Sequence, residues 1–388
     1  MKFIHSADWH LGRMLHEQSL QEEQKKFLDW FVHTCEESAP EMVVLAGDIF
    51  DRSIPSEDAI ALWTGFLVNF HHTCPGIPLV VIPGNHDNPT RLSFASGVLK
   101  SSGIHVIGTF KQSIEPLEFS SIQGEKVQIW ALPFLWPGAL DRPSPLGPVP
   151  TGTQEESLLE ALSHITALQD SEALQILGAH CFTRGGRVSE SERTLVGTAT
   201  QIDAEAFSAF DYTALGHLHK PQMVTPRMWY AGSPLAYSFS ESTDKKCLLE
   251  ITLSKGLEPQ IRVIPVPVTR PVTVLRGSLT EILTDLRFRE HQNSYLRVET
   301  TDTGGLTQPF HRLREVFPFI LSYEFFENQA VHPEISRHSM EPMRWELKKD
   351  IKEDFSDFLQ DLSLSQEEII SFEKSFSTLA TRLIPEEQ

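Results

Sequence analysis

The chain has 388 residues, of which 40% are hydrophobic and 22% are charged. This length is too great for one small core, so we expect two or three domains with the composition of an ordinary globular protein. The formal net charge of −19 argues against a protein that holds nucleic acid by its own charge, because such proteins are usually basic.

Features of membrane or secreted proteins are not expected. Every apolar run stays well short of the roughly 20 residues that span a bilayer, and the N-terminus enters a predicted strand without a secretory apolar region. The four cysteines are scattered and form no CxxC pair, which favours free thiols in a reducing compartment over a disulfide scaffold or a zinc ribbon. We therefore expect a cytoplasmic protein without membrane association.

Residues 1–270 alternate predicted strands and helices, as in an α/β fold. Apolar side chains at helical spacing predict three helices, at residues 18–37, 56–72 and 155–168. Ser56 is a suitable N-cap for the second helix. Five prolines between residues 137 and 153 exclude regular structure there and predict a long surface loop. From residue 228 to 268 the pattern turns to strands.

Two further units are expected after residue 270. Residues 271–339 carry a strand–helix–strand–helix–strand pattern, which predicts a small α+β domain. Its first helix begins at Ser278, with Glu281 at capping-box spacing. Residues 340–388 contain two amphipathic helices, and the sequence offers no obvious core to cover their apolar faces.

Five short segments with metal-binding side chains each follow a predicted strand. They are Asp8-Trp9-His10, Gly47-Asp48-Ile49-Phe50-Asp51, Gly84-Asn85-His86-Asp87, Gly178-Ala179-His180 and Gly216-His217-Leu218-His219. In sheets with helical crossovers, functional groups gather where the carboxyl ends of the strands meet. We therefore expect the five segments to form one shared site.

The candidate metal ligands are two carboxylates, one amide and four imidazoles: Asp8, His10, Asp48, Asn85, His180, His217 and His219. Mn²⁺, Mg²⁺ and Fe²⁺ favour such oxygen and nitrogen donors and accept five or six of them. Seven donors are too many for one ion, and they suit two ions about 3.5–4 Å apart that share a bridging carboxylate. The absence of cysteine disfavours a structural zinc site.

Each segment taken alone has an ordinary structural explanation. An Asp-x-His pair is common, Gly-Asp-x-x-Asp could cap a helix or a turn, and a single histidine after a strand means little. Gly-Asn-His-Asp and Gly-His-x-His are more specific, because strand ends seldom carry so many polar side chains without a structural need. Their joint occurrence, in this order and all after strands, disfavours a purely structural origin. The remaining histidines lie outside this pattern, and we expect packing or surface positions for them.

This ordered set resembles the calcineurin-like binuclear metallophosphoesterases. Within that superfamily the chain is similar to the nuclease subunits of DNA double-strand-break repair complexes. The segments that carry the narrower resemblance are DWHLG at 8–12, GDIFD at 47–51, RGGRVSESER at 184–193, YAGSP at 230–234 and SFSE at 238–241. The resemblance implies a β-sandwich flanked by helices for residues 1–270. It also implies a small α+β capping domain at 271–339 and a helical pair at 340–388 that binds an ATPase partner.

The same resemblance implies a role for each candidate residue. It assigns the ligands to two ions: Asp8, His10 and His219 to the first, Asn85, His180 and His217 to the second, and Asp48 to both. His86 would stand over the scissile phosphate, as proton donor to the leaving oxygen or as stabiliser of its charge. Asp87 would orient His86 by a hydrogen bond. Some relatives carry histidine where this chain has Asp51, so turn stabilisation is as good an expectation for Asp51 as a catalytic role.

By resemblance, the expected activity is metal-dependent hydrolysis of DNA phosphodiesters, with Mn²⁺ first and Mg²⁺ or Fe²⁺ as alternatives. The expected forms are a 3′→5′ exonuclease on duplex ends and an endonuclease on single strands and hairpins, in DNA repair, recombination and replication. Two divalent ions would place about four positive charges at the phosphate. An SMC-like ATPase partner would supply much of the DNA-holding surface, in a heterotetramer built on a homodimer of this chain.

Two other functions remain open at this point. A small-molecule phosphodiesterase could use the same fold, although such enzymes commonly lack the units expected after residue 270. A non-catalytic scaffold could have kept the fold and lost its metals, but the complete ligand set with His86 and Asp87 argues against it.

Overall fold

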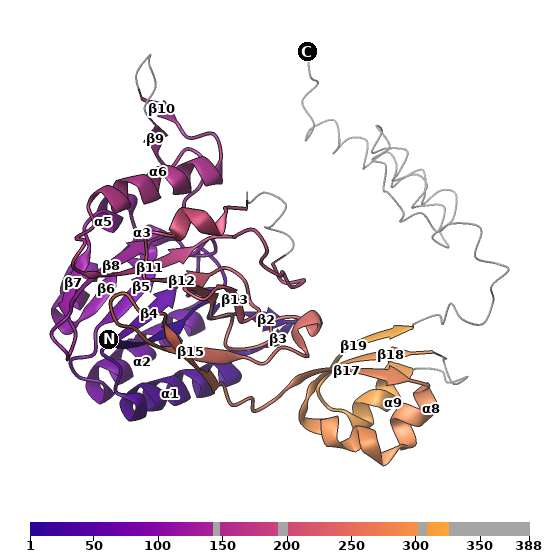
Figure 1. Ribbon diagram of the computed structural model, residues 1–388. Coiled ribbons are helices and arrows are strands. Elements are labelled where there is room, and N and C mark those ends of the chain that lie inside the picture. Colours follow the sequence, from indigo (N-terminus) through magenta and orange to yellow (C-terminus); the bar gives the residue numbers. More distant parts are fainter. Residues whose placement is uncertain (143–147, 193–200, 302–308, 326–388) are drawn as a thin grey trace, which may run out of the picture. The chain divides into compact units, whose positions relative to one another are not determined.

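Two six-stranded sheets form the centre of the protein (Figure 1). The structure, a computed structural model, describes residues 1–142, 148–192, 201–301 and 309–325. In the first sheet the strand order is β16 (Gln260–Pro265), β15 (Cys247–Thr252), β1 (Lys2–Ser6), β4 (Met42–Ala46), β5 (Leu79–Ile82) and β6 (Ile104–Val106). Strands β1, β4, β5 and β6 run parallel, and β15 and β16 join them in antiparallel pairs.

The second sheet also has a parallel centre, but both of its edge strands are antiparallel to their neighbours. Its order is β13 (Gln222–Thr225), β14 (Met228–Tyr230), β12 (Tyr212–Gly216), β11 (Leu174–His180), β8 (Lys126–Leu132) and β7 (Leu117–Ser120). Strands β14, β12, β11 and β8 run parallel, whereas β13 and β7 are antiparallel to their neighbours. In each sheet, the carboxyl ends of the parallel strands therefore reach the same edge.

The alternation of side chains along β4 explains how the layers pack. Val43 and Leu45 join an apolar cluster with α1 (Gln21–Ser38) and α2 (Glu57–Thr73), whereas Val44 joins a cluster shared with the second sheet. Successive residues of a strand point to opposite faces, so one strand serves two cores. On the far side, α6 (Gln154–Ala167) packs on the second sheet through a third cluster. The arrangement is the predicted β-sandwich flanked by helices (Figure 1).

The main helices follow the sequence signals closely. The predicted helix at 18–37 is α1, and the one at 155–168 is α6, each with boundaries shifted by a few residues. Ser56 caps α2 as predicted, because its hydroxyl accepts a hydrogen bond of 3.3 Å from the backbone N–H of Ala59.

The proline-rich stretch differs from its prediction. Within it, β9 (Asp141–Arg142) and β10 (Val149–Pro150) pair over two residues each. Pro150 is tolerated because so short a ladder can leave its missing N–H on the unpaired side. The expectation of no regular structure between residues 137 and 153 is therefore wrong in this detail.

The described residues also form several short elements. They are β2 (Met14–Leu15), β3 (Gln18–Ser19), α3 (Pro89–Leu92), α4 (Ser96–Leu99) and α5 (Phe110–Ser113), with 3₁₀ turns at Lys100–Ser102, Ala204–Phe207, Phe239–Glu241 and Leu286–Asn293. Within the described ranges, no helix combines the length and the apolar character needed to cross a bilayer.

A separate three-stranded sheet follows the sandwich in the chain. It consists of β17 (Val272–Gly277), β18 (Tyr295–Thr300) and β19 (Ile320–Phe325), all parallel, with α8 (Leu279–Thr284) and α9 (Pro309–Val316) in the connections. Its apolar core includes Leu275, Val298 and Phe317. The predicted strand–helix alternation is confirmed. The boundary at residue 270 stays a prediction, because Met1–Glu327 form one compact unit. The helical pair predicted at 340–388 lies outside the described residues.

Candidate metal centre

The five predicted segments do meet, at the shared edge of the two sheets. Three of them follow β1, β4 and β5, which are neighbours in the first sheet, and two lie at the ends of β11 and β12, which are neighbours in the second. Parallel pairing puts the carboxyl ends of neighbouring strands side by side. Face-to-face packing then brings the two edges together, so the site receives side chains from both layers.

The backbone at this edge is bent into conformations that side chains seldom adopt. The φ angles are +56° at Asp8, +44° at His10, +49° at Asp48 and +110° at His217. Such angles cost of order 1–3 kcal/mol each and persist only when the surroundings enforce them. Backbone hydrogen bonds do so here, from the N–H of Asp8 to Gly47 O at 3.0 Å and from the N–H of His10 to Asp48 O at 2.9 Å.

Two glycines allow the segments to approach this closely. A Cβ at Gly84 would lie 2.1 Å from Oδ1 of Asp48, and one at Gly216 would lie 1.7 Å from the carbonyl oxygen of Ala46. Any side chain at Gly216 would therefore push the end of β12 away from the end of β4. At these two positions, the glycine that precedes the polar residues is thus required by the close contact between the segments.

Asp48 lies at the middle of the cluster. Its Oδ2 is 3.6 Å from Nε2 of His10 and 3.4 Å from Nε2 of His180. Its Oδ1 accepts a hydrogen bond of 2.9 Å from the backbone N–H of His86. The carboxylate therefore faces one histidine from each sheet with the same oxygen atom, the position that a bridging ligand needs.

On one side of Asp48, Nε2 of His10 and Nε2 of His219 lie 3.0 Å apart. Asp8 faces the second sheet, because its Oδ1 accepts a hydrogen bond of 2.9 Å from the N–H of His217 and lies 3.8 Å from Nδ1 of His180. Oδ2 of Asp8 is buried and has no hydrogen-bond partner among the described residues. Following the division expected from the resemblance, we call Asp8, His10 and His219 the first half of the centre.

On the other side, Asn85 joins the two histidines of the second sheet. Its Oδ1 lies 3.1 Å from Nε2 of His180 and 3.0 Å from Nδ1 of His217. The other ring nitrogen of His180, Nδ1, lies 2.9 Å from the carbonyl oxygen of Ala46. Nε2 of His217 is buried without a partner in the part of the chain that the structure describes. We call Asn85, His180 and His217 the second half.

Burial and mutual charge disturb the ionisation of these groups strongly. Burial raises the pKa of Asp8 to about 7, with nearby His180 and His219 opposing it. Burial would raise the pKa of Asp48 too, but the charge and hydrogen bond of His180 outweigh it and hold that pKa well below its usual range. Burial works against protonated His180, yet Asp48 raises its pKa to about 9. Burial and the charge of His180 lower the pKa of His217 to about 3.

The donor set fits divalent cations. Carboxylate, amide and imidazole donors without cysteine are the ligands of hard or borderline ions. A buried carboxylate oxygen without a partner is costly unless a cation or a proton satisfies it, and Oδ2 of Asp8 is such an atom. Among the described residues, two triads each have donor atoms that lie within 4.8 Å of one another: Asp8, Asp48 and His180 form one triad, and His10, Asp48 and His86 form the other. The second triad contains His86, for which the sequence did not predict a ligand role.

His86 and Asp87 correct one sequence-based expectation. Nδ1 of His86 lies 2.8 Å from the carbonyl oxygen of Asp51, and this backbone group orients the ring. Asp87 accepts hydrogen bonds from the backbone N–H groups of Ile49, Phe50 and Gly84 at 2.9–3.0 Å. The prediction that Asp87 accepts a hydrogen bond from His86 is therefore wrong. Through these bonds Asp87 ties the Asp48 segment to the Asn85 segment.

Burial and the nearby charge of Asp48 raise the pKa of Asp87 to about 6, against the effect of its three backbone donors. Asp51 accepts a hydrogen bond of 2.7 Å from Arg13, and its Oδ1 lies 3.7 Å from Nδ1 of His10. Asp51 thus supports the turn, as expected, and also stands behind a candidate ligand.

Reasoning from the sequence assigned no role to four residues that surround His219. Ser191, Glu192, Glu241 and Lys246 all contact this residue or its backbone. Two of the segments that carried the resemblance, at 184–193 and 238–241, contain three of them. The signal was present in those motifs, but their distance in sequence from His219 concealed the contact.

Comparison with known proteins gives a family and a relative. The sequence profile of the family described as calcineurin-like phosphoesterase matches residues 1–221, a range that includes all seven candidate ligands. The SbcD component of the nuclease SbcCD from Staphylococcus epidermidis is 31% identical over 324 residues, which cover 83% of this chain and 84% of that protein.

Two solved structures resemble part of this chain in fold. A Thermus thermophilus protein has a TM-score of 0.36 and 12% identity, covering 64% of this chain and 93% of its own. A dimetal phosphatase from Danio rerio has a TM-score of 0.40 and 11% identity, covering 69% and 99%. With TM-scores this low, neither likeness bears on function.

Proposed function

This chain belongs to the calcineurin-like phosphoesterase family, whose members hydrolyse phosphate esters, and on that premise we propose that it is a divalent-metal-dependent DNA nuclease. One observation carries the choice of DNA. The similarity to a nuclease subunit extends over 324 residues, more than the 221 of the phosphoesterase match. It therefore includes sequence beyond the part that small-molecule phosphodiesterases of this fold would share.

The proposed metal ligands are seven residues: the three of each half, and Asp48 between them. Asp8, His10 and His219 would hold one ion, Asn85, His180 and His217 the other, and Asp48 would contact both. The distances between Asp48 and one histidine of each half support the shared role of Asp48. Mn²⁺ is the proposed ion, with Mg²⁺ or Fe²⁺ as alternatives that accept the same donors. Ions bound here supply water of lowered pKa and neutralise charge on the phosphate oxygens.

His86 is the proposed proton donor to the leaving oxygen. A protonated imidazole donates from both nitrogens, and Nδ1 of His86 is engaged by the carbonyl oxygen of Asp51. Nε2 then carries the proton that can be transferred. The ring lies edge-to-face against His10 with centroids 4.8 Å apart, so it borders the centre. The predicted role of Asp87 changes accordingly: it holds the loops that carry Asp48 and His86.

The proposed reactions are 3′→5′ exonuclease cleavage of duplex ends and endonuclease cleavage of single strands and hairpins, in DNA end processing and repair. An SbcC-type SMC-like ATPase is the proposed partner, with this chain as a homodimer in a heterotetramer. The net charge of −19 supports a basic partner, because an acidic chain gains little from counterion release on its own. The proposed docking segment is 340–388, after a capping domain at 271–339 and a nuclease domain at 1–270.

Incubation of the purified full chain with end-labelled hairpin DNA tests the proposal, with and without the ATPase partner, across Mn²⁺, Mg²⁺ and Fe²⁺. We expect metal-dependent opening of the hairpin, with the partner extending cleavage on long duplexes. A small-molecule phosphodiesterase would hydrolyse bis-p-nitrophenyl phosphate but leave the hairpin intact. A scaffold would bind fewer than one ion at micromolar Mn²⁺ and cleave neither.

A further inference from the structure

The two ring nitrogens of His219 face different surroundings. Nε2 lies 3.0 Å from Nε2 of His10, inside the centre. Nδ1 lies 2.7 Å from Oγ of Ser191 and 3.5 Å from Oε1 of Glu241, outside it. A neutral imidazole carries one N–H, so a hydrogen bond donated by Nδ1 leaves Nε2 with a free lone pair. The direction of the hydrogen bond at Nδ1 therefore decides whether Nε2 can bind a cation.

Glu241 sets that direction. As a carboxylate it only accepts hydrogen bonds, and its Oε1 lies 2.8 Å from Oγ of Ser191, which donates to it. The single proton of Ser191 is then engaged, so Ser191 must accept at the His219 side. Nδ1 of His219 therefore carries the proton. Glu241 is 1% exposed, so this arrangement is buried.

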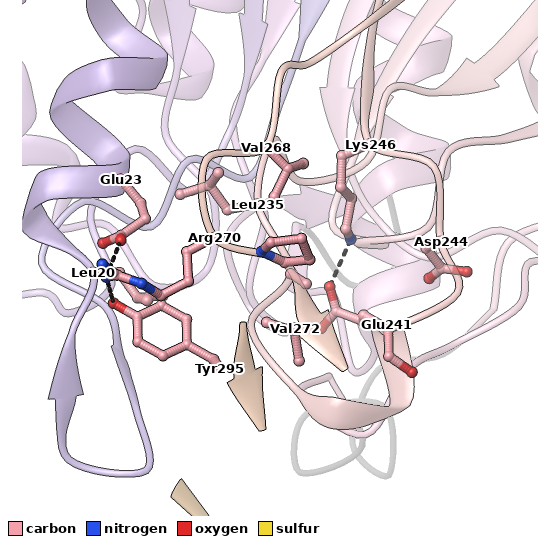
Figure 2. A pocket seen from close by; sticks show the side chains of 13 residues that line it. Leu20, Glu23, Leu235, Glu241, Asp244, Lys246, Val268, Arg270, Val272 and Tyr295 are labelled. Carbon is pink, nitrogen blue, oxygen red and sulfur yellow. Dashed lines mark hydrogen bonds and ion pairs between the residues drawn. The ribbon is translucent and has the colours of Figure 1, made fainter. Parts of the chain in front are cut away.

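Lys246 holds Glu241 in place and balances its charge. Its ammonium nitrogen lies 2.6 Å from Oε2 of Glu241, 2.9 Å from the carbonyl oxygen of His219 and 2.9 Å from Oγ of Ser233. All three of its N–H donors are therefore engaged, and one of them donates to the backbone carbonyl of His219 itself. Figure 2 shows the Lys246–Glu241 pair in the wall of a cavity of about 300 Å³, which Leu235 and Val268 also line.

The other candidate ligands lack such an arrangement. The outward ring nitrogen of His180 faces the backbone carbonyl of Ala46 at 2.9 Å. That of His10 is 3.7 Å from Asp51, beyond hydrogen-bond distance. That of His217 has no partner among the residues that the structure describes. Among the four histidines, within the described part of the chain, His219 alone has a side chain hydrogen-bonded to its outward nitrogen, and a buried carboxylate engages that side chain.

We propose that Glu241, balanced by Lys246, is a positioning residue that holds His219 as the Nδ1–H tautomer through Ser191, so that Nε2 is free for the first metal ion. The inference rests on the proposed role of His219 as a ligand. Groups that orient a ligating histidine from behind typically change metal affinity by about 10–100-fold when they are replaced.

Glu241→Gln makes the sharpest test, because it should reverse the hydrogen bond. Lys246 can only donate, so the amide oxygen of the new side chain must face it. The amide N–H₂ then faces Ser191, which accepts from it and donates to Nδ1 of His219. His219 becomes the Nε2–H tautomer, and Nε2 is blocked. We expect one of the two Mn²⁺ sites of the full chain to weaken by about 10–100-fold in equilibrium titrations, while the other keeps its affinity.

The tautomer itself is measured without metal, from ¹⁵N chemical shifts of labelled histidines in the presence of a chelator, with His219→Gln identifying the signal. We expect Nδ1–H in the unaltered chain and Nε2–H in Glu241→Gln. Adding Lys246→Met to Glu241→Gln removes the donor that forces the flip. The double variant should therefore regain the original tautomer and most of the metal affinity, which a merely structural role would not produce.

Glu250→Gln is the matched control. Glu250 is also a buried carboxylate in an ion pair, 2.7 Å from Arg262, but its partners are Arg262 and Ser38 rather than a ligand. This variant should bind both ions as the unaltered chain does. If Glu241→Gln fails to fold, Ser191→Ala keeps the carboxylate and should weaken the same site by a smaller factor.

Unchanged metal affinity together with the Nδ1–H tautomer in Glu241→Gln would overturn the inference, as would unchanged affinity in Ser191→Ala. Failure of the unaltered chain to bind two ions would contradict the proposed function instead. The tautomer measurement needs no metal, and it would still decide whether Glu241 positions His219.

Discussion

The two halves of the metal centre are held in place by different kinds of group. In the first half, the side chains of Ser191 and Glu241 lie 2.7 and 3.5 Å from Nδ1 of His219, whereas Asp51 lies 3.7 Å from Nδ1 of His10, beyond hydrogen-bond distance. These supporting side chains come from segments far apart in the sequence. The first half therefore depends on residue identity at several distant positions.

In the second half, the hydrogen bond behind His180 comes from the backbone. Nδ1 of His180 faces the carbonyl oxygen of Ala46, the last residue of β4, and this carbonyl is present whatever side chain stands there. The contact exists because the two sheets pack closely at Gly216. Single substitutions behind the candidate ligands should therefore weaken metal binding in the first half more than in the second.

Asp48→Ala should have the largest effect, because Asp48 is the residue that the two halves share. Its removal takes away the oxygen that lies near both His10 and His180. We expect neither ion to be retained and hairpin cleavage to fall to background, measured by metal content after dialysis and by gel assay. Asp58→Ala, at an exposed carboxylate of α2, should change neither quantity. If Asp48→Ala retains one ion, the residues of one half hold that ion without the Asp48 carboxylate.

His86→Gln should separate chemistry from metal binding in both halves. The ring borders the centre, and a neutral amide cannot act as the proton donor. We expect both ions to bind with unchanged affinity and the cleavage rate to fall by about 10²–10⁴-fold. The measurements are metal titration and single-turnover cleavage. A variant that opens hairpins at the original rate would show that His86 has no part in the reaction.

Asp87→Ala tests the link between the segments that carry the two halves. It leaves three buried backbone N–H groups without their acceptor. We expect a loss of about 3 kcal/mol in the free energy of unfolding of the metal-free chain, at about 1 kcal/mol for each hydrogen bond. Asp87→Asn keeps one acceptor oxygen and should lose less. If the unaltered chain, Asp87→Ala and Asp87→Asn are equally stable and only cleavage is reduced, Asp87 would again be the residue that orients His86.

The smallest effect concerns a buried histidine that belongs to neither half. Burial lowers the pKa of His5 to about 3, against a backbone hydrogen bond to Leu215. The folded state therefore binds a proton less readily than the unfolded state, whose pKa is 6.5. Stability from His5 is fully present above pH 6.5 and is lost as the pH falls towards 3.

Between pH 7 and pH 5 this loss amounts to about 2 kcal/mol. Chemical unfolding of the chelated protein at both pH values measures it. In His5→Gln the difference between pH 7 and pH 5 should shrink by that amount. An unchanged difference would assign the acid sensitivity to the histidines of the centre.

The candidate donors and their local surroundings could be predicted from the sequence. Runs such as 42–46 and 79–82 are apolar over four or five residues and are followed by glycine and polar residues, a local pattern that predicts a strand with a functional end. The alternation after residue 270 was equally local, and β17, α8, β18, α9 and β19 appear where it predicted them. The identity of the seven donors needed no knowledge of which strands are neighbours.

Only the tertiary structure decided how these pieces support one another. Nothing in the sequence separates β1, β4 and β5 into one sheet and β11 and β12 into another, because strand partners are chosen by packing between distant segments. The contact of His86 with Asp51 O, and of Asp87 with three N–H groups, involves backbone atoms that every residue carries. Glu241 meets His219 only because folding brings both to the same buried place. The sequence gives the residue types directly. The direction of a hydrogen bond, however, depends on which donors and acceptors the folded backbone places next to one another.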